Sequence, residues 1–354
     1  MARVLVAMSG GVDSSVAALL LKQAGNQCVG VTMQLVPADG VEQQLHSQSP
    51  EIAAICEQLE IEHRSIDLRA EFLRDVIAPF VTAYTNAETP NPCITCNRCL
   101  KFGFLLDYAM QEAFDALATG HYARIVYDEA RKVYRLLKAK DTEKDQSYVL
   151  YQLGQSQLAK LRFPLGELTK DQVRATASNA GLSVAAKKES QDICFIPDGD
   201  YSAFVRRFHT AAIEPGEIVD SQGNVLGYHQ GICDFTIGQR KGLGVAVGHP
   251  LFVTGIDAVS NRVIVGEHDE LLHQKALLRD FHAVVPGELE PVMIVSAKYR
   301  YRSAEQPARL VMFDDGRWEV QFDQPQAALT PGQSVVCYQG DEVIAGGIIA
   351  EVRG

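Results

Sequence analysis

Strand-like and helix-like patterns alternate through the first 120 residues of the chain. The stretches 3–8, 28–33, 63–68 and 116–119 have the length and pattern of strands. Between them, Gly25 can end one helix, and Ser49-Pro50-Glu51 combines a capping residue with a first-turn proline that can start another. Residues 70–87 have the pattern of a long helical stretch. This alternation predicts an α/β domain with a doubly wound parallel sheet, which binds ligands at the carboxyl ends of its strands.

The pattern changes beyond the tract 197–211, which we interpret as a transition. Short apolar runs separated by glycine turns follow at 250–257, 262–266, 292–298, 308–313, 318–322, 334–338 and 343–349. Alternation with turns at this spacing predicts small β domains. We therefore expect a first domain over 1–210, a central β-rich domain over 211–275 and a C-terminal β-barrel over 276–354.

Composition narrows the class of protein. With 354 residues, 47% hydrophobic and 22% charged, the chain resembles an ordinary globular protein of two or three domains. No apolar run approaches the roughly 20 residues of a membrane span, and Met1-Ala2-Arg3 leads straight into a strand pattern, so we expect a cytoplasmic protein with no membrane partner. In that compartment the eight cysteines are expected to serve as thiols or metal ligands rather than as a disulfide framework. The net charge of −11 argues against non-specific nucleic-acid binding, although 298–309 is locally basic and contains two tyrosines.

The segment Ser9-Gly10-Gly11-Val12-Asp13-Ser14-Ser15 lies between the first strand and the first helix. Glycines let backbone N–H groups approach an anion, and the helix N-terminus attracts negative charge, so the segment is suited to phosphate. It is not a Walker A loop, because no lysine occurs before Lys22. A simpler interpretation is a glycine turn in which Ser14 only caps the helix. Met33 at the end of the second strand and Gly120 after the later one could face the same nucleotide.

Two cysteine segments carry the second set of candidate residues. In the first, either Asn91 with Pro92 or Thr95 begins a helix, and both choices put Cys96 near the first turn, beside Arg98 and Lys101. Such surroundings favour a thiolate. In the second segment Cys194 precedes Phe195-Ile196. A reactive role for Cys194 depends on whether the fold brings it close to Cys96.

The loop sequence Ser-Gly-Gly-Val-Asp-Ser-Ser resembles the signature of the ATP pyrophosphatases, which split ATP between the α and β phosphates. Together with further segments, it resembles the tRNA 2-thiouridylases of the MnmA family, in the right order over nearly the whole chain. The segments that carry this resemblance are Thr89–Gly103, Ala118–Arg124, Lys144–Tyr148, Glu189–Ile196, Gly238–Gly244, Arg300–Arg302 and Thr330–Gln333.

The resemblance implies a reaction and assigns roles to residues. ATP on the loop would adenylate the position-2 oxygen of the wobble uridine in tRNA, and Cys194 would carry persulfide sulfur from a donor protein. Cys96 would be the partner thiol, so that the reaction ends in a Cys96–Cys194 disulfide or in hydrosulfide. Asp13 would bind Mg²⁺, which takes one or two carboxylates beside phosphate oxygens. The implied ATP contacts are Ala7, Met8, Ser9, Gly10, Gly11, Val12, Asp13, Ser14, Met33 and Gly120. The implied tRNA contacts are Asn91, Pro92 and Cys93 at the target base, with His121, Lys144, Asp145, Gln146, Arg300, Tyr301 and Gln333.

The chain departs from the family pattern in its cysteines. Cys93 stands where many members have aspartate, and Cys99 extends the pattern to Cys-x2-Cys-x2-Cys. These thiols leave open an iron–sulfur cluster held by Cys93, Cys96 and Cys194, although the spacing lacks the fourth cysteine and proline of the bacterial ferredoxin motif.

The phosphate-loop motif by itself is compatible with two further classes of protein. One is an amide-forming ATP pyrophosphatase, for which no glutaminase segment is evident in the chain and which would not explain paired reactive cysteines. The second is a non-catalytic RNA-binding protein built on a nucleotide fold. Pyrophosphate release that depends on tRNA distinguishes a thiolase from the non-catalytic protein.

Overall fold

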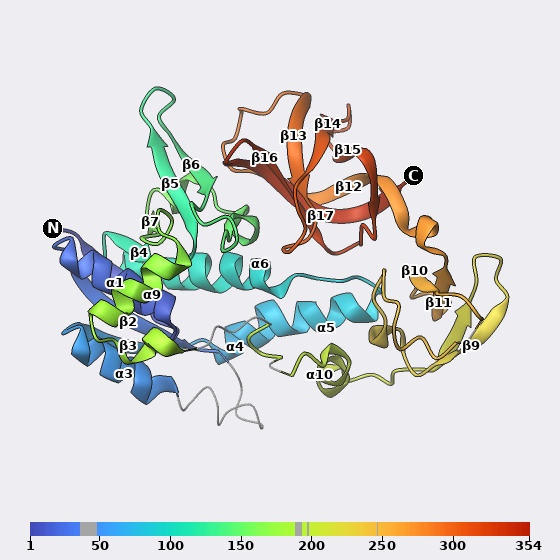
Figure 1. Cartoon of the computed structure of the whole chain (residues 1–354), viewed down its shortest axis with the longest axis horizontal. Helices are drawn as coiled ribbons and strands as arrows, with labels where there is room; N and C mark the ends of the chain where they lie inside the picture. The colour runs from blue at the N-terminus through green and yellow to red at the C-terminus, as the bar shows by residue number, and fades with distance from the viewer. Residues whose placement is uncertain (36–47, 188–192, 197, 246) are drawn as a thin grey trace.

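The computed structural model describes residues 1–35, 48–187, 193–196, 198–245 and 247–354 (Figure 1). In these residues the N-terminal sheet has five strands in the order β3-β2-β1-β4-β7. Every neighbouring pair in it is parallel, which confirms the predicted doubly wound sheet. Its strands are β1 (Arg3–Ala7), β2 (Gln27–Gln34), β3 (Glu62–Asp67), β4 (Ala116–Ala118) and β7 (Leu161–Arg162).

Helices cover both faces of this sheet because successive strand residues point to opposite sides. Val4 and Val6 of β1 face a core built with α1 (Val12–Gln23), α3 (Gln48–Gln58) and α9 (Lys170–Asn179). Leu5 of the same strand faces the opposite core, which includes Phe102 and Leu105. The elements on that side are α6 (Pro92–Cys96), the π-helical η2 (Asn97–Phe104), α7 (Leu105–Gln111), η3 (Ser147–Leu150) and α8 (Gln155–Leu158).

The structure adds detail to two predicted segments. The predicted helical stretch 70–87 is confirmed, and it consists of α4 (Arg69–Phe72), the π-helical η1 (Leu73–Ile77) and α5 (Ala78–Thr85) in succession. The tract 197–211 contains the helix α10 (Tyr201–Phe208), whose Val205 is buried against α5 side chains. The Asp200 carboxylate caps this helix by accepting a hydrogen bond from the Ala203 amide.

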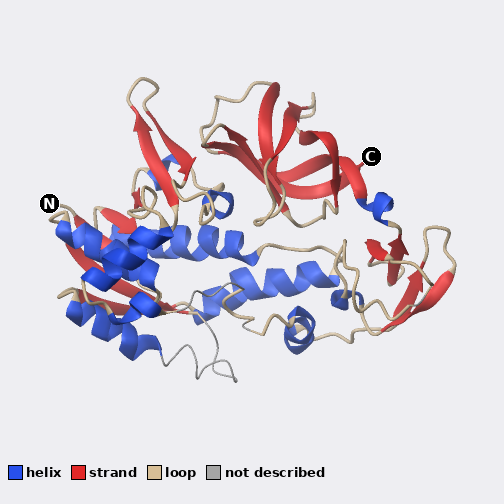
Figure 2. Cartoon of the chain, viewed as in Figure 1, coloured by secondary structure: helices blue, strands red, loops and turns tan. Residues whose placement is uncertain are grey.

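Figure 2 shows that strands dominate the remainder of the chain. A four-stranded sheet in the order β10-β11-β8-β9 is followed by a closed antiparallel barrel in the order β12-β15-β14-β13-β16-β17, with β12 pairing β17. The central strands are β8 (Gly216–Val219), β9 (Val225–His229), β10 (Phe252–Asp257) and β11 (Arg262–Gly266). The barrel strands are β12 (Leu272–Ala283), β13 (Val292–Lys298), β14 (Gln306–Met312), β15 (Trp318–Ala327), β16 (Ser334–Gln339) and β17 (Glu342–Arg353). The short helical turns are η4 (Ser183–Ala186), η5 (Ile232–Asp234) and η6 (His268–Leu271).

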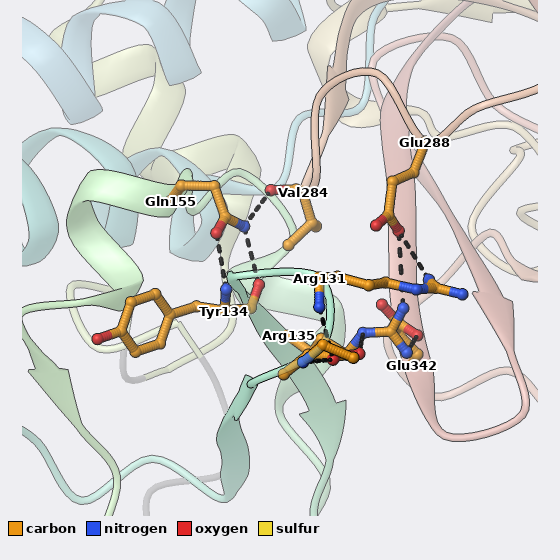
Figure 3. Close-up of polar contacts among 9 residues, drawn as sticks. Arg131, Tyr134, Arg135, Gln155, Val284, Glu288 and Glu342 are labelled. Atoms are coloured by element: carbon orange, nitrogen blue, oxygen red, sulfur yellow. Dashed lines mark hydrogen bonds and ion pairs between the residues drawn. The ribbon is translucent and has the colours of Figure 1, made fainter.

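A hairpin from the first region joins the barrel, which the sequence pattern does not predict. It consists of β5 (Ala123–Asp128) and β6 (Val133–Lys138), and β6 pairs with β17. Figure 3 shows the ionic contacts that hold it: Arg135 lies 2.9 Å from Glu342, and Arg131 lies 3.2 Å from Glu288. The Gln155 amide adds hydrogen bonds to the carbonyls of Tyr134 (2.8 Å) and Val284 (2.9 Å). These contacts anchor the barrel to the parallel-sheet region.

No helix among the described residues is long and apolar enough to cross a membrane.

Candidate functional site

The predicted phosphate loop follows β1 and folds around its own hydroxyl groups. Gly10 has a φ of +71°, which favours glycine, and Gly11 is the residue before α1. The Ser14 hydroxyl lies 3.2 Å from both the Ser9 amide and the Ser9 hydroxyl. Ser14 therefore closes the loop. It does not cap α1, because Gly11 occupies the N-cap position and no side-chain capping hydrogen bond forms there. The first backbone N–H groups of α1 have no intrahelical acceptor and point toward the loop, which suits an anion.

The other predicted nucleotide residues come together at the same edge of the sheet. Ala7 ends β1, Met33 lies near the end of β2, and Gly120 follows β4. The Met8 amide donates to the Val31 carbonyl at 2.8 Å, and its side chain is buried with that of Val12. Parallel strands end at one edge, so the predicted convergence of these residues follows from the fold.

Gly120 makes the closest approach to the loop. A Cβ at this position would lie 2.7 Å from the Ser14 nitrogen and 2.8 Å from the Asp13 carbonyl carbon. Both atoms belong to the backbone at the start of α1, so neither can move without moving the loop. Glycine at 120 therefore allows the segment after β4 to support the phosphate loop.

Asp13 makes polar contacts that no sequence motif indicates. Lys170, the first residue of α9, places its ammonium 2.8 Å from each Asp13 carboxylate oxygen, and the Tyr122 hydroxyl donates to Asp13 Oδ1 at 2.7 Å. The Lys170 side chain is 9% exposed and that of Asp13 is 32% exposed. Figure 1 shows α1 and α9 side by side, as this ion pair requires. The Thr169–Gln172 capping box indicates the start of α9, but no local pattern pairs residues 157 positions apart.

The first cysteine segment begins its helix at Pro92, which decides between the two starts left open by the sequence. The Asn91 side chain accepts a hydrogen bond from the Cys93 amide at 3.1 Å, and Pro92 occupies the first helical position. Cys93 is exposed and Pro92 is buried. Cys96 consequently lies at the end of this short helical turn, beyond the free N–H groups.

The fold places Cys194 in the neighbourhood of Cys96. Cys96 and Cys99 pack against an apolar cluster that contains Phe195 and Ile196. Cys194 and Cys93 lie near enough for their charge to raise the pKa of Cys96. All eight cysteines are described, and each is a free thiol. Lys188 and Glu189–Asp192, which belong to the second cysteine segment, lie outside the described residues.

The predicted thiolate at Cys96 is corrected. Burial raises the pKa of this thiol to about 12, and Lys101 opposes the shift only in part. Burial also raises the pKa of Cys194, and Cys93 raises it further. The sequence suggested the opposite direction because it showed the cations and the helix start but not the aromatic cluster, formed by residues such as Phe80 and Phe195, that packs around this region.

Several residues that are predicted to contact tRNA make hydrogen bonds or packing contacts within the protein. His121 is buried between Phe102 and Phe163, its Nδ1 lies 2.7 Å from the Thr119 hydroxyl, and desolvation holds its pKa well below the usual value. Asp145 accepts hydrogen bonds from the Ala139 amide and the Ser147 hydroxyl, at 2.9 and 2.7 Å. Lys144 is half-buried. Their roles toward tRNA stay predictions.

Gln146 links the segment predicted to contact tRNA to the phosphate loop. Its side chain accepts a hydrogen bond from the Tyr122 amide at 3.0 Å, and its own amide donates to the Tyr122 carbonyl at 2.8 Å. The Tyr122 hydroxyl in turn contacts Asp13 of the phosphate loop. The two predicted groups of residues are thus joined through one tyrosine.

Of the predicted barrel residues, Tyr301 is exposed, Arg300 is half-buried and Gln333 lies at an interface. Tyr301 is 39% exposed, and the Arg300 guanidinium donates to the Ala328 carbonyl at 2.8 Å. The Gln333 side chain instead donates to the Thr89 carbonyl at 2.8 Å, while the Thr89 amide donates to the Pro331 carbonyl at 2.9 Å. We call these two hydrogen bonds the Thr89 clamp. It holds the chain two residues before Asn91, and no local pattern in the sequence indicates it.

Known proteins and protein families match nearly the whole chain. Residues 2–198, 202–267 and 273–349 match the families described as tRNA methyl transferase HUP domain, tRNA methyl transferase PRC-barrel domain and aminomethyltransferase beta-barrel domain. A protein of Caldanaerobacter subterraneus subsp. tengcongensis named tRNA-specific 2-thiouridylase MnmA 2 is 47% identical, over 98% of this chain and 97% of its own. The tRNA-specific 2-thiouridylase MnmA of Chloroflexus aggregans is 46% identical over 99% of both chains. The chain belongs to the tRNA-specific 2-thiouridylase family.

Among solved structures, a U34-tRNA thiolase, NcsA, from Methanococcus maripaludis with its [4Fe-4S] cluster is 18% identical, and the match covers 58% of this chain and 65% of that one with a TM-score of 0.36. The 2-thiouridylase family membership confirms the resemblance read from the sequence motifs. Family membership does not assign roles to individual residues, which stay predictions.

Proposed function

We propose that the protein catalyses the ATP-dependent 2-thiolation of the wobble uridine of tRNA. The observation that carries the proposal is the pairing of a phosphate loop with two neighbouring cysteines, Cys96 and Cys194, in a chain that matches 2-thiouridylases over its full length. The loop supplies backbone donors for phosphate, and the cysteines supply sulfur chemistry.

In the proposed reaction the position-2 oxygen of the uridine attacks the α phosphate of ATP, and pyrophosphate leaves. The terminal sulfur of a persulfide on Cys194 attacks the adenylated carbon, and AMP leaves. The Cys96 thiolate then attacks the Cys194 sulfur, the bond between Cys194 and the transferred sulfur breaks, and that sulfur stays on the base as the 2-thio group, which leaves a Cys96–Cys194 disulfide. In a second version of the step, Cys96 first releases the sulfur as hydrosulfide. Asn91, Pro92 and Cys93 are proposed to contact the target base, since they precede Cys96 on one rigid turn.

ATP is proposed to bind with Mg²⁺, whose chemistry is to neutralise phosphate charge. Among the described residues, no three His, Cys, Asp or Glu side chains converge on a metal position. Asp13, the predicted ligand, already shares both carboxylate oxygens with Lys170. Asp13 therefore does not fit the role of a free metal ligand in this arrangement, and we assign no step to a protein-held metal ion.

An iron–sulfur cluster on Cys93, Cys96 and Cys194 is the second candidate, favoured by the neighbourhood of the three thiols. The described side chains do not converge as a ligand set for it. We therefore derive no step through a cluster. Thiolation by rigorously iron-free protein, compared with anaerobically reconstituted protein, separates the two candidates.

The proposed partners follow from this reaction. They are tRNA and a sulfur-donor protein, a cysteine desulfurase or a sulfur-relay protein, with the reaction placed in the cytoplasm. We propose that 1–210 form the catalytic domain, 211–275 the central domain and 276–354 a barrel that contacts tRNA through Arg300 and Tyr301.

The test is incubation of the protein with ATP, Mg²⁺, an unmodified tRNA transcript and a persulfide donor, followed by mass spectrometry of the nucleosides. We expect 2-thiouridine at the wobble position together with stoichiometric AMP and pyrophosphate. AMP formation without any sulfur product would favour an amide-forming ATP pyrophosphatase. Absence of tRNA-dependent pyrophosphate release would favour a non-catalytic RNA-binding protein.

A further inference from the structure

Asp13 presents an electrostatic problem at the phosphate loop. It lies in the first turn of α1, where backbone N–H groups and the helix dipole attract an anion. A carboxylate is itself stabilised at this position, but its negative charge repels a triphosphate that approaches the same helix end. Neutralising the Asp13 charge would therefore strengthen ATP binding to a loop that holds the phosphates through its backbone.

Lys170 is placed to neutralise it. Its ammonium contacts both carboxylate oxygens at 2.8 Å, and its side chain is nearly buried. The lysine is held from behind: its backbone amide donates to Asp141 Oδ2 at 2.8 Å, and the Thr169–Gln172 capping box fixes the start of α9. The hydroxyl of Tyr122 adds a third donor at 2.7 Å.

We propose that Lys170 is a positioning residue for ATP, which holds Asp13 as a neutral ion pair so that the start of α1 stays attractive to phosphate. In this proposal Asp13 acts as the partner of Lys170 and not as a Mg²⁺ ligand. The proposal rests on the proposed function only in that ATP is the ligand of the loop.

The two roles of Asp13 predict opposite results for charge-removing variants. If Lys170 neutralises Asp13, Lys170→Met leaves a bare carboxylate beside the triphosphate and weakens ATP binding about tenfold or more. The double variant Asp13→Asn/Lys170→Met removes both charges and restores ATP affinity to within about threefold of wild type. If Asp13 instead ligates Mg²⁺, Asp13→Asn alone weakens binding of Mg·ATP, and the double variant stays weak.

The experiment measures the dissociation constant of a non-hydrolysable ATP analogue by calorimetry, with Mg²⁺ and with EDTA, in the full-length protein. We expect the Lys170→Met defect both with and without Mg²⁺, because it arises from Asp13 and the phosphates. Lys170→Arg should recover most of the affinity, and Lys160→Met, at an exposed position in another segment, is the matched control. A defect of Asp13→Asn that is confined to Mg²⁺-containing buffer would overturn the proposal.

The same variants also serve as controls for effects on folding. Removing one member of a nearly buried ion pair destabilises a protein more than removing both. We therefore expect the double variant to have a higher Tm than Lys170→Met. If the double variant folds and still binds the analogue tenfold more weakly than wild type, the proposal is wrong. If wild type binds the analogue and yet releases no tRNA-dependent pyrophosphate, the proposed function fails while this inference stands.

Discussion

The phosphate loop and the cysteine pair, which we propose serve one reaction, have different surroundings. At the loop, Asp13 is matched by Lys170 and Tyr122, and the serine hydroxyls close the turn. At the cysteines, aromatic and aliphatic side chains dominate, and burial raises the pKa of both Cys96 and Cys194. The nucleotide end is therefore preorganised for charge, whereas the thiol end favours the protonated, unreactive form.

This difference separates two chemical needs. Phosphate binding requires fixed donors, and reorganising them at the moment of reaction would cost free energy. In this structure desolvation disfavours the thiolate form of both Cys96 and Cys194. Variants at the loop and at the cysteines test this difference.

Cys194→Ser should abolish thiolation without affecting adenylation. An alcohol cannot carry a persulfide, so we expect 2-thiouridine to fall below detection while tRNA-dependent AMP formation stays within about twofold of wild type. Nucleoside mass spectrometry and pyrophosphate release measure the two products. Cys99→Ser is the matched control at a partly buried thiol and should retain thiolation. Wild-type 2-thiouridine yield in Cys194→Ser would contradict its role as the sulfur carrier.

Gly120→Ala should damage the nucleotide end selectively. The added methyl group would lie 2.7 Å from the Ser14 nitrogen, so the loop must shift away from its position at the start of α1. We expect ATP affinity to fall about tenfold or more, because the shifted loop and α1 N-terminus no longer hold their backbone donors in position for the phosphates. Gly154→Ala, where an added Cβ meets nothing closer than 3.9 Å, is the control. Unchanged ATP affinity in Gly120→Ala would show that the loop tolerates displacement.

The sulfur-transfer step should depend steeply on pH, in contrast to adenylation. Because burial raises the pKa of Cys96 to about 12, its thiolate fraction increases about tenfold per pH unit throughout the neutral and mildly alkaline range. We expect the single-turnover rate of Cys96–Cys194 disulfide formation to keep rising between about pH 7 and pH 9, the range below that pKa. Trapping the disulfide by acid quench and mass spectrometry measures this rate. A plateau below about pH 8 would indicate that bound substrate lowers the pKa of this thiol.

Much of the fold was predictable from sequence because it depends on local pattern. The apolar strands at 3–8 and 28–33 and the glycine loop between them correspond to β1, β2 and the start of α1. The convergence of Met33 and Gly120 with the loop required only the rule that ligands bind at the carboxyl edge of parallel strands. The later β runs likewise became the strands of the central sheet and the barrel.

The contacts that could not be predicted join residues far apart in the sequence. Lys170 meets Asp13 across 157 positions, and Gln333 meets Thr89 across 244. The direction of the Cys96 pKa shift was wrong for a related reason. Local cations such as Lys101 are visible in the sequence, whereas desolvation depends on which distant side chains pack around the sulfur.

Gly332→Ala tests whether the barrel supports the cysteine segment through the Thr89 clamp. Gly332 has a φ of +90°, and a Cβ would lie 2.9 Å from both the Thr89 nitrogen and the Glu88 Cβ, so alanine disturbs the clamp without removing any side chain. We expect kcat for thiolation to fall about threefold to tenfold while tRNA affinity stays near wild type. Gly287→Ala, also at positive φ but with open space around it, controls for backbone strain. A loss confined to tRNA affinity would instead favour direct tRNA contact by this turn.

The double variant Arg300→Ala/Tyr301→Ala should produce the mildest and most selective change. Tyr301 is partly exposed, and Lys298 lies 5.7 Å from its ring centroid, so the pair belongs to a basic, aromatic surface suited to stacking with RNA bases. We expect tRNA affinity to fall about threefold to tenfold, because a single stacked base contributes roughly 1–3 kcal/mol and the partial exposure places this contact at the lower end. ATP affinity should not change, since both residues belong to the barrel region and not to the phosphate loop. Filter binding of tRNA at two salt concentrations separates the loss of the arginine charge from the loss of stacking, because only the former changes the salt dependence. Equal tRNA affinity in the variant and wild type would move the RNA-contacting surface of the barrel away from these two residues.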